Sequence, residues 1–212
     1  MKTILIPVKQ YHRAKTRLAK DLPAPARAAL AAALCEDFFC LVAEVRGAER
    51  VCVVSAEQRA LQLARQRGWQ TIVETEQISE SHSVDAAARL CAAMGATSLL
   101  RLPIDIPLTK PADIDEILSL VELGPSAILV PSRDGTGTNA LLRSPPDLFP
   151  SHFGPGSFAL HLAEAQRCSA RVRVIENPRI ALDIDEDSDL TALSGLLDPA
   201  SAMAGWIAQY RP

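Results

Sequence analysis

The sequence predicts one α/β domain of three layers, in which a mostly parallel sheet lies between two layers of helices. Short apolar runs rich in β-branched residues or leucine alternate with longer segments rich in alanine and leucine that show helical spacing. This alternation is typical of parallel sheets, whose strands are buried on both faces. Because the length of 212 residues suits one core and no internal repeat divides the chain, residues 1–212 are expected to form a single domain.

Short, almost continuously apolar segments are the expected strands of this sheet. They are residues 3–8, 50–54, 70–73, 97–102, 126–131 and 170–175. The expected helices are residues 24–46, 57–67, 84–94, 112–123, 157–167 and 188–197. The tail after Asp198 contains Trp206 and Tyr210 and is expected to pack either on this domain or on the second subunit of a homodimer. Ligands of such sheets bind beyond the carboxyl ends of the strands, so motifs that directly follow a strand are the first candidates for a site.

Composition narrows the range of partners. The 22 Lys and Arg residues against 25 Asp and Glu give a net charge of −3, which argues against a nucleic-acid binder or a membrane-surface binder. No stretch approaches the ~20 apolar residues of a membrane-spanning helix, and the apolar run that ends at Lys9 is too short for a signal peptide. The five cysteines form no CxxC pair, which favours buried free thiols in a reducing compartment. We therefore expect a cytoplasmic protein.

A strongly basic segment follows the first expected strand. In the motif IPVKQYHRAKTRL, the residues Lys9, Arg13, Lys15 and Arg17 stand close together with almost no counter-charge. Ammonium and guanidinium groups form charge-assisted hydrogen bonds with phosphate oxygens, so this segment is a candidate polyphosphate site, with a solvated cationic loop as the alternative. The chain has no GxGxxG motif after this strand and no GxxxxGK[ST] motif. A dinucleotide-binding domain and a P-loop NTPase are therefore disfavoured.

Three aspartates are candidate ligands for Mg²⁺. Asp105 stands in LRLPIDIPLT, where the flanking prolines end a buried strand and hold the carboxylate at its carboxyl end. Asp183 and Asp185 are two positions apart in LDIDEDSDL, so in an extended segment both side chains project to one face, where they could share one or two cations. The alternatives are an ordinary turn aspartate at position 105 and an acidic cap for the helix that begins near Ser188.

Two glycine-rich segments form a candidate pocket for a second anionic substrate. They read DGTGTNALL at 134–142 and FGPGSFALH at 153–161. Glycines and small hydroxyl residues let backbone N–H groups approach an anion, and Ser157 opens an expected helix whose N-terminus attracts phosphate or carboxylate. Ordinary loop turns are the alternative reason for the glycines. His152 and His161 flank this pocket, and a structural hydrogen-bonding role is favoured for them over a catalytic role.

The motifs IPVK....AKTRL, LP.D.PL, DGTGTNALL, FGPGS...H and DIDEDSDL together resemble the guanylyltransferases of deazaflavin coenzyme biosynthesis, a branch of the nucleotide-diphospho-sugar transferase-like fold. The motifs span most of the chain and occur in the family's order. The resemblance implies transfer of GMP from GTP to 2-phospholactate, phosphoenolpyruvate or 3-phosphoglycerate, with Mg²⁺ as cofactor and pyrophosphate as product. It also implies which residues hold the metal and the acceptor: Asp105, Asp183 and Asp185 for Mg²⁺, and Thr138, Asn139, Gly154 and Ser157 for the acceptor.

The nucleotide side of the site is expected to combine a base contact with phosphate contacts. Where the family carries Gly-Leu-Asn near the base, this chain has Ser83, Val84 and Asp85. Asp85 is expected to accept hydrogen bonds from the N1–H and the exocyclic amine of guanine. The expected triphosphate contacts are Lys9, Lys15 and Arg17, and the expected catalytic residues are Lys15, Arg17 and Asp105. The attacking phosphate of the acceptor is already ionised, so no general base is required.

Two other functions fit parts of this pattern. One is a nucleotidyltransferase for another cofactor, such as a molybdopterin. The other is a non-catalytic module that senses GTP or phosphate, although three carboxylates in the pocket would weaken a pure binder of anions. The sequence does not distinguish among the three acceptor acids, because each carries one carboxylate and one phosphate.

Overall fold

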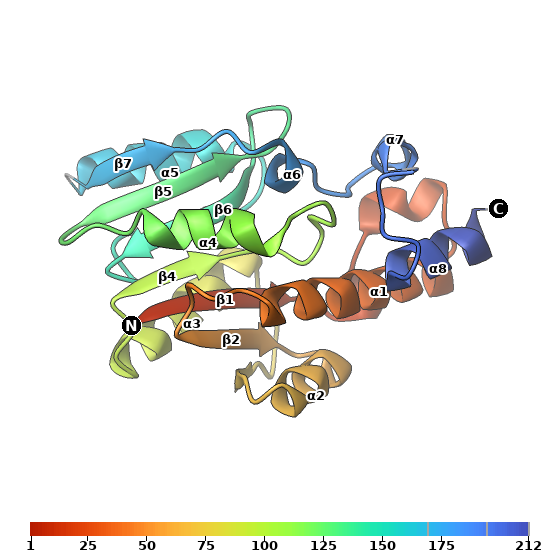
Figure 1. Cartoon of the computed structure of the whole chain (residues 1–212), viewed down its shortest axis with the longest axis horizontal. Helices are drawn as coiled ribbons and strands as arrows, with labels where there is room; N and C mark the ends of the chain where they lie inside the picture. Colours follow the sequence, from red (N-terminus) through yellow and green to blue (C-terminus); the bar gives the residue numbers. More distant parts are fainter. Residues whose placement is uncertain (169, 194, 212) are drawn as a thin grey trace.

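The computed structural model describes residues 1–168, 170–193 and 195–211 and confirms the three-layer α/β architecture (Figure 1). Within these residues, seven strands form one sheet in the order β3-β2-β1-β4-β6-β5-β7. The strands are β1 (Lys2–Val8), β2 (Arg50–Ser55), β3 (Gln70–Val73), β4 (Ser98–Arg101), β5 (Ser126–Pro131), β6 (Thr138–Ser144) and β7 (Arg171–Val174). Neighbouring strands are parallel except at β6, which runs antiparallel to both β4 and β5. The sheet is therefore mixed but mostly parallel.

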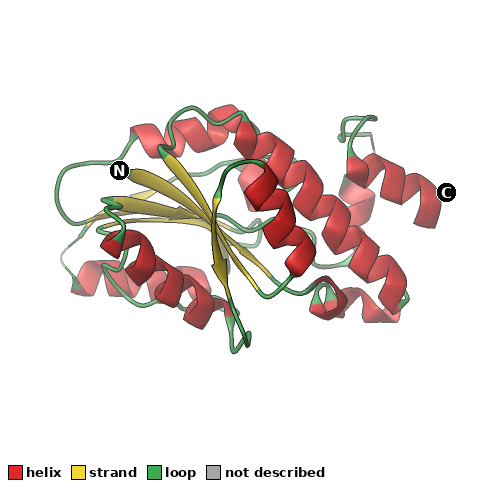
Figure 2. Ribbon diagram, turned by 90° about the horizontal axis from the view of Figure 1, so that it is seen from below, coloured by secondary structure: helices red, strands yellow, loops and turns green. Residues whose placement is uncertain are grey.

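Helices cover both faces of the sheet (Figure 2). The helices are α1 (Ala24–Ala43), α2 (Gln58–Gln66), α3 (Glu80–Ala93), α4 (Pro111–Ser119), α5 (Ser157–Arg167), α6 (Pro178–Ala181), α7 (Asp187–Ala192) and α8 (Ala202–Tyr210), with 3-10 turns at Tyr11–Arg13 and Thr16–Lys20. Along β1, Ile4 and Ile6 face a core shared with α1, α2 and α4, whereas Leu5 faces a core shared with α3. Successive strand residues point to opposite faces, so α3 lies on the face opposite to α1. In the described part of the chain, no helix is both long enough and apolar enough to cross a membrane.

The C-terminal helix packs on its own domain, which is the first of the two places expected for the tail. Trp206 donates a hydrogen bond from Nε1 to the carbonyl oxygen of Ala26 at 3.0 Å. Met203 and Trp206 are buried in a cluster with Leu30 and Leu34 of α1. Figure 1 shows α8 lying along the outer end of α1.

The strand β6 was not predicted, because the sequence indicated a glycine-rich loop over residues 134–142. The structure ends that loop at Gly137, and all seven residues of β6 are buried. A strand buried on both faces lacks alternation between polar and apolar residues, so its polar start at Thr138 and Asn139 looks like a continuation of the loop. Both of these predicted acceptor residues therefore lie on the sheet itself.

Several helices differ from the expected ranges. The helices expected at 24–46 and 112–123 end earlier, at Ala43 and Ser119, and two helices beside the pocket also differ. The helix expected at 84–94 begins at Glu80, because the side chain of Ser79 accepts a hydrogen bond from the backbone N–H of His82 and caps the helix. The helix expected at 188–197 is shorter, since α7 ends at Ala192. Residue 194 of that expected helix lies outside the described residues.

Candidate active site

A pocket of about 1030 Å³ opens at the edge of the sheet where β1 and β4 end and β6 begins. This is the edge that the carboxyl ends of the parallel strands share, as expected for ligand sites in α/β sheets. The predicted site residues that line it are Lys9, Lys15, Arg17, Asp105, Thr138, Asn139, Gly154, Ser157, Asp183 and Asp185. Asp85 does not line it. The fold therefore brings residues from five separate segments of the sequence into one pocket.

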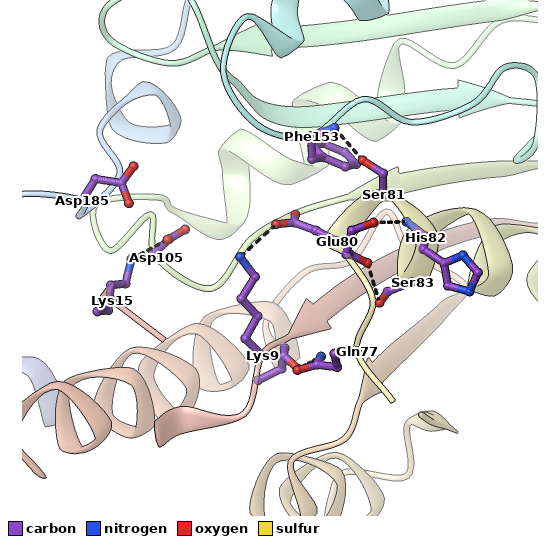
Figure 3. Close-up of polar contacts among 12 residues, drawn as sticks. Lys9, Lys15, Gln77, Glu80, Ser81, His82, Ser83, Asp105, Phe153 and Asp185 are labelled. Carbon is purple, nitrogen blue, oxygen red and sulfur yellow. Dashed lines mark hydrogen bonds and ion pairs between the residues drawn. The ribbon is translucent and has the colours of Figure 1, made fainter. Parts of the chain in front are cut away.

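Lys15 joins the basic loop to the acidic side of the pocket (Figure 3). Its backbone is left-handed, with φ of 54°, which is uncommon for a residue that carries a Cβ and costs roughly 1 kcal/mol. The side chain is 7% exposed, and Nζ donates hydrogen bonds to Asp105 Oδ2 at 2.5 Å and to the carbonyl oxygen of Ile184. The basic segment has almost no counter-charge nearby in sequence, but the fold supplies it from distant residues.

Lys9 and Arg17 of this loop are more open to solvent than Lys15. Arg17 Nη1 lies 2.5 Å from Asp185 Oδ2, and Lys9 Nζ lies 4.0 Å from Glu80 Oε2. Both basic side chains are 62% exposed. Exposed ion pairs of this kind contribute only about 0–1 kcal/mol, so Lys9 and Arg17 can exchange these partners for a phosphate at little cost.

The acidic side of the pocket is assembled by backbone and side-chain contacts. The backbone N–H of Ile184 donates to the carbonyl oxygen of Asp105 at 3.0 Å, which brings the two acidic segments together. Ile184 is fully buried while Asp183 and Asp185 line the pocket, which is the alternation expected of an extended segment. Asn139 Nδ2 donates to Asp183 Oδ1 at 3.1 Å and to two backbone carbonyl oxygens of α6.

Asn139 therefore has a different set of contacts from the one the sequence predicted. Its amide nitrogen is occupied by Asp183 and by the carbonyl oxygens of Ile180 and Ala181. An amide NH₂ offers two hydrogens, so little donor capacity remains for an acceptor acid. In this structure Asn139 holds the acidic segment in place, and its contact with the acceptor stays a prediction.

The three carboxylates affect one another's ionisation. Burial, followed by the charge of Asp105, raises the pKa of Asp183. Burial also raises the pKa of Asp185, although the charge of Lys15 opposes this. For Asp105 burial disfavours the ionised form, but the charge and hydrogen bond of Lys15 outweigh it and hold the pKa below its ordinary value. Lys15 thus mainly stabilises the negative charge of Asp105. Asp183 is the carboxylate whose charge is least offset by a nearby cation.

The donor chemistry of this side of the pocket suits a hard cation. Among residues 1–168, 170–193 and 195–211, no group of three or more His, Cys, Asp or Glu side chains lies close enough to form a metal site as the structure stands. Carboxylate oxygens are nevertheless the ligands that Mg²⁺ prefers, and a cation would relieve the repulsion that raises the pKa of Asp183. The residues that would hold such an ion are Asp105, Asp183 and Asp185.

Arg101 is a pocket residue that none of the sequence motifs indicated. It is 5% exposed, pairs with Glu80, and lies 4.1 Å from the ring centroid of Phe153. Its Nη1 donates to the carbonyl oxygens of Thr138 and Asn139 at 3.3 and 3.4 Å. The sequence feature that could have indicated it is an arginine within the apolar run TSLLRL. Arginine is almost never fully buried unless it is paired, so its presence in a buried strand indicates a partner charge. Arg101 fastens three segments of the pocket wall to one another.

The glycine-rich segment before α5 forms the third side of the pocket. Gly154 has φ of 132° and Gly156, the N-cap of α5, has φ of 72°, so both positions favour glycine. Ser157, the first residue of α5, is buried, and its Oγ donates to Thr138 Oγ1 at 3.3 Å. Figure 3 shows the backbone of Phe153 bonded to a serine of α3, which fixes this segment on the neighbouring helix. Hydroxyls beside a helix N-terminus suit an anionic ligand.

The predicted contact between Asp85 and the base is wrong in its placement. Asp85 accepts hydrogen bonds from the backbone N–H and the hydroxyl of Ser151, with distances between 2.7 and 3.1 Å, and lies 3.2 Å from Arg143 Nη1. Arg143 is 1% exposed, so Asp85 neutralises a buried cation on the side of α3 that faces away from the pocket. The carboxylate is thus satisfied by the protein and does not line the pocket.

This placement predicts a stability effect for Asp85→Asn. Removing the charge leaves Arg143 buried without its carboxylate, which should lower the free energy of unfolding by about 2–3 kcal/mol. For a chain of this length, the midpoint temperature of thermal unfolding should then fall by roughly 5–10 °C. The ratio of kcat/KM for GTP to that for ATP should not change. Asp147→Asn is the matched control, because Asp147 also lies near Arg143 but is exposed. A lower preference for GTP together with an unchanged melting temperature would instead support a contact between Asp85 and the guanine base.

The sheet order and the helices on both of its faces are the features of the fold that this chain shares with solved nucleotidyltransferases, and the charged pocket lies at the carboxyl edge of that sheet. Solved structures bear out this class. The chain aligns with a putative nucleotide-diphospho-sugar transferase from Desulfovibrio desulfuricans with a TM-score of 0.77 at 16% identity, covering 98% of this chain and 94% of that one. It aligns with a nucleotidyl transferase from Methanothermobacter thermautotrophicus with a TM-score of 0.62 at 15% identity, covering 99% of both chains. At these identities the likeness shows the fold.

The chain belongs to the family described as guanylyl transferase CofC like, which matches residues 1–195. It is 38% identical over 210 residues to the phosphoenolpyruvate guanylyltransferase of Rubrobacter xylanophilus, covering 98% of this chain and 96% of the relative. It is 31% identical to the 3-phospho-D-glycerate guanylyltransferase of Colwellia psychrerythraea, covering 93% of each. It is 30% identical to the 2-phospho-L-lactate guanylyltransferase of Methanothermobacter thermautotrophicus, covering 90% of this chain and 83% of the relative. The family resemblance of the motifs is thereby confirmed.

Proposed function

We propose that this protein is a cytoplasmic enzyme that transfers GMP from GTP to a small acid carrying one carboxylate and one phosphate, and releases pyrophosphate. The observation that carries this is the pocket itself, which combines a basic loop, three aspartates and a hydroxyl-lined helix N-terminus. We place phosphoenolpyruvate first among the acceptors, because relatives at 38% and 34% identity bear that name. The alternatives are 3-phosphoglycerate and 2-phospholactate.

The reaction joins two anions, so charge is the main obstacle. An oxygen of the acceptor phosphate attacks the α-phosphorus of GTP, and the bond between that phosphorus and the β-phosphate oxygen breaks. Lys9 and Arg17 are exposed enough to bind the triphosphate, and the Lys15 ammonium, which stays paired with Asp105, adds a fixed positive charge to the pocket. Fixed cations of this kind stabilise the charge that builds on the leaving pyrophosphate. The acceptor phosphate is ionised at neutral pH and needs no general base.

We further propose that Mg²⁺ is the cofactor and that Asp105, Asp183 and Asp185 hold it. The support is the carboxylate set on one side of the pocket and the raised pKa of Asp183 that results from burial and from Asp105. When bound, the ion would neutralise the phosphates and draw nucleophile and triphosphate together.

Pyrophosphate release tests the proposed function directly. With Mg²⁺ present, we expect turnover with GTP and phosphoenolpyruvate, and a lower kcat/KM with ATP or CTP. The three acceptor acids are compared at one GTP concentration. A reaction without any acceptor acid measures the background hydrolysis of GTP. GTP binding without pyrophosphate release in the presence of any of the three acids would favour the sensing module, and a kcat/KM for ATP equal to that for GTP would contradict the guanylyl assignment.

A further inference from the structure

A chain of hydrogen bonds runs from a buried histidine to the pocket. His161 of α5 is fully buried and does not line the pocket, whereas Thr138 of β6 does. His161 Nδ1 lies 3.0 Å from Thr138 Oγ1. On the other side of the ring, the backbone N–H of His152 donates to His161 Nε2 at 2.8 Å. The ring is thus held between a backbone donor and the threonine hydroxyl.

These contacts determine which ring nitrogen of His161 carries the hydrogen. A backbone N–H can only donate, so Nε2 must be the unprotonated nitrogen, and in a neutral ring Nδ1 then carries the hydrogen. Burial, followed by the charges of Arg101 and Arg143, lowers the pKa of His161 to about 3. The ring is therefore neutral near pH 7, and Nδ1–H donates to Thr138 Oγ1.

The hydroxyl of Thr138 consequently has one direction left for its hydrogen. A hydroxyl oxygen has two lone pairs and one hydrogen. One lone pair accepts from His161 Nδ1, and the other accepts from Ser157 Oγ at 3.3 Å. Because Nδ1–H of His161 donates to Thr138, the hydrogen of Thr138 cannot point at the histidine, and with Ser157 Oγ as the donor to Thr138 it does not point at the serine either. It is left to face the pocket that Thr138 lines.

We infer that His161 is a positioning residue for the acceptor acid, because it fixes the Thr138 hydroxyl as a donor aimed into the pocket. This rests on the proposed function, in which Thr138 contacts the acceptor. Carboxylate and phosphate oxygens only accept hydrogen bonds, so a hydroxyl held as a donor matches them. A donor that is already oriented requires no rearrangement when the anion binds.

A pair of variants separates positioning from packing. His161→Asn places an amide nitrogen near the position of Nδ1 and can still donate to Thr138. His161→Gln places its amide near the position of Nε2, so it can accept from His152 but leaves Thr138 without its donor. We expect His161→Gln to raise KM for phosphoenolpyruvate about fivefold, the effect of one neutral hydrogen bond, with KM for GTP unchanged. His161→Asn should rescue the acceptor KM to within about twofold of the wild type.

A double-mutant cycle shows whether the effect passes through Thr138. In a Thr138→Val background the hydroxyl is gone, so His161→Gln should have no further effect on the acceptor KM. Thermal unfolding of each variant is followed in parallel. Equal rises in KM for both substrates, or equal effects of the Asn and Gln variants, would show that His161 only packs and would overturn the inference.

Calorimetric binding of phosphoenolpyruvate keeps this test independent of the proposed function. Wild-type turnover by itself decides whether the protein is a guanylyltransferase. If turnover fails, binding still measures the role of His161, since weaker binding in His161→Gln but not in His161→Asn supports it. Equal binding by both variants, or no binding by the wild type, overturns it.

Discussion

Lys15→Ala is expected to lower kcat/KM for GTP by about 100- to 1000-fold, the usual cost of losing one fixed group that stabilises transition-state charge. Lys15 is 7% exposed and its Nζ is held by Asp105 and by the carbonyl oxygen of Ile184, so the charge is already in position before substrate binds. The same change leaves Asp105 without its cation. It should therefore also lower the free energy of unfolding by about 1–3 kcal/mol.

A second variant separates these two effects of Lys15. In Lys15→Ala combined with Asp105→Ala, the unpaired carboxylate is removed. The melting temperature of this double variant should therefore recover most of the loss, while activity stays low. Lys20→Ala is the control, since Lys20 is exposed on the same loop and does not line the pocket. If KM and kcat are unchanged in Lys15→Ala, the basic segment is only a solvated loop.

The strands that the sequence predicted are those whose apolar runs stand out locally. The runs 3–8 and 126–131, for example, lie at β1 and β5. The convergence of the aspartates was also predictable, because Asp105 directly follows a strand and alternation along an extended segment puts Asp183 and Asp185 on one side. β6 was missed because a buried strand that opens with Thr138 and Asn139 carries no periodic signal.

The orientation of Asp85 was not predictable, because it depends on the phase of a helix. Successive residues of an α-helix are rotated by about 100°, so positions two apart point in nearly opposite directions. Ser83 lines the pocket, and Asp85 accordingly faces Arg143 on the far side. That phase could not be deduced from the residues alone, since the helix was expected to begin at 84 and begins at Glu80.

The ion pairs of the pocket were not predictable either, because they join residues that are far apart in the chain. Lys15 and Asp105 are separated by 90 positions, and Arg17 and Asp185 by 168. From sequence, the basic segment and the aspartates look like independent sites for phosphate and metal. In the fold the basic side chains and the aspartates neutralise each other. Each set of charges therefore holds the other in place until phosphates or a cation compete for these contacts.

Asp183→Asn is expected to lower kcat by about 100-fold or more while the fold is retained. Among the three aspartates proposed to hold Mg²⁺, Asp105 pairs with Lys15 and Asp185 pairs with Arg17, whereas Asp183 has no basic partner among the described residues and its Oδ1 accepts an amide hydrogen bond from Asn139. An Asn side chain can keep that hydrogen bond through its own oxygen. The repulsion from Asp105 disappears, so the melting temperature of the variant should equal that of the wild type or exceed it.

The magnesium dependence of Asp183→Asn decides what the lost charge does. An amide oxygen is a weaker ligand than a carboxylate, so a metal site should need more Mg²⁺ for half-maximal pyrophosphate release, and Mn²⁺ should restore part of the rate. Asp185→Asn should show the same shift together with the loss of its pair with Arg17. Asp187→Asn is the control, because Asp187 follows in the same segment but does not line the pocket. Full activity of Asp183→Asn at the wild-type Mg²⁺ requirement would eliminate the metal assignment, because a ligand cannot lose its charge without weakening its hold on a hard cation.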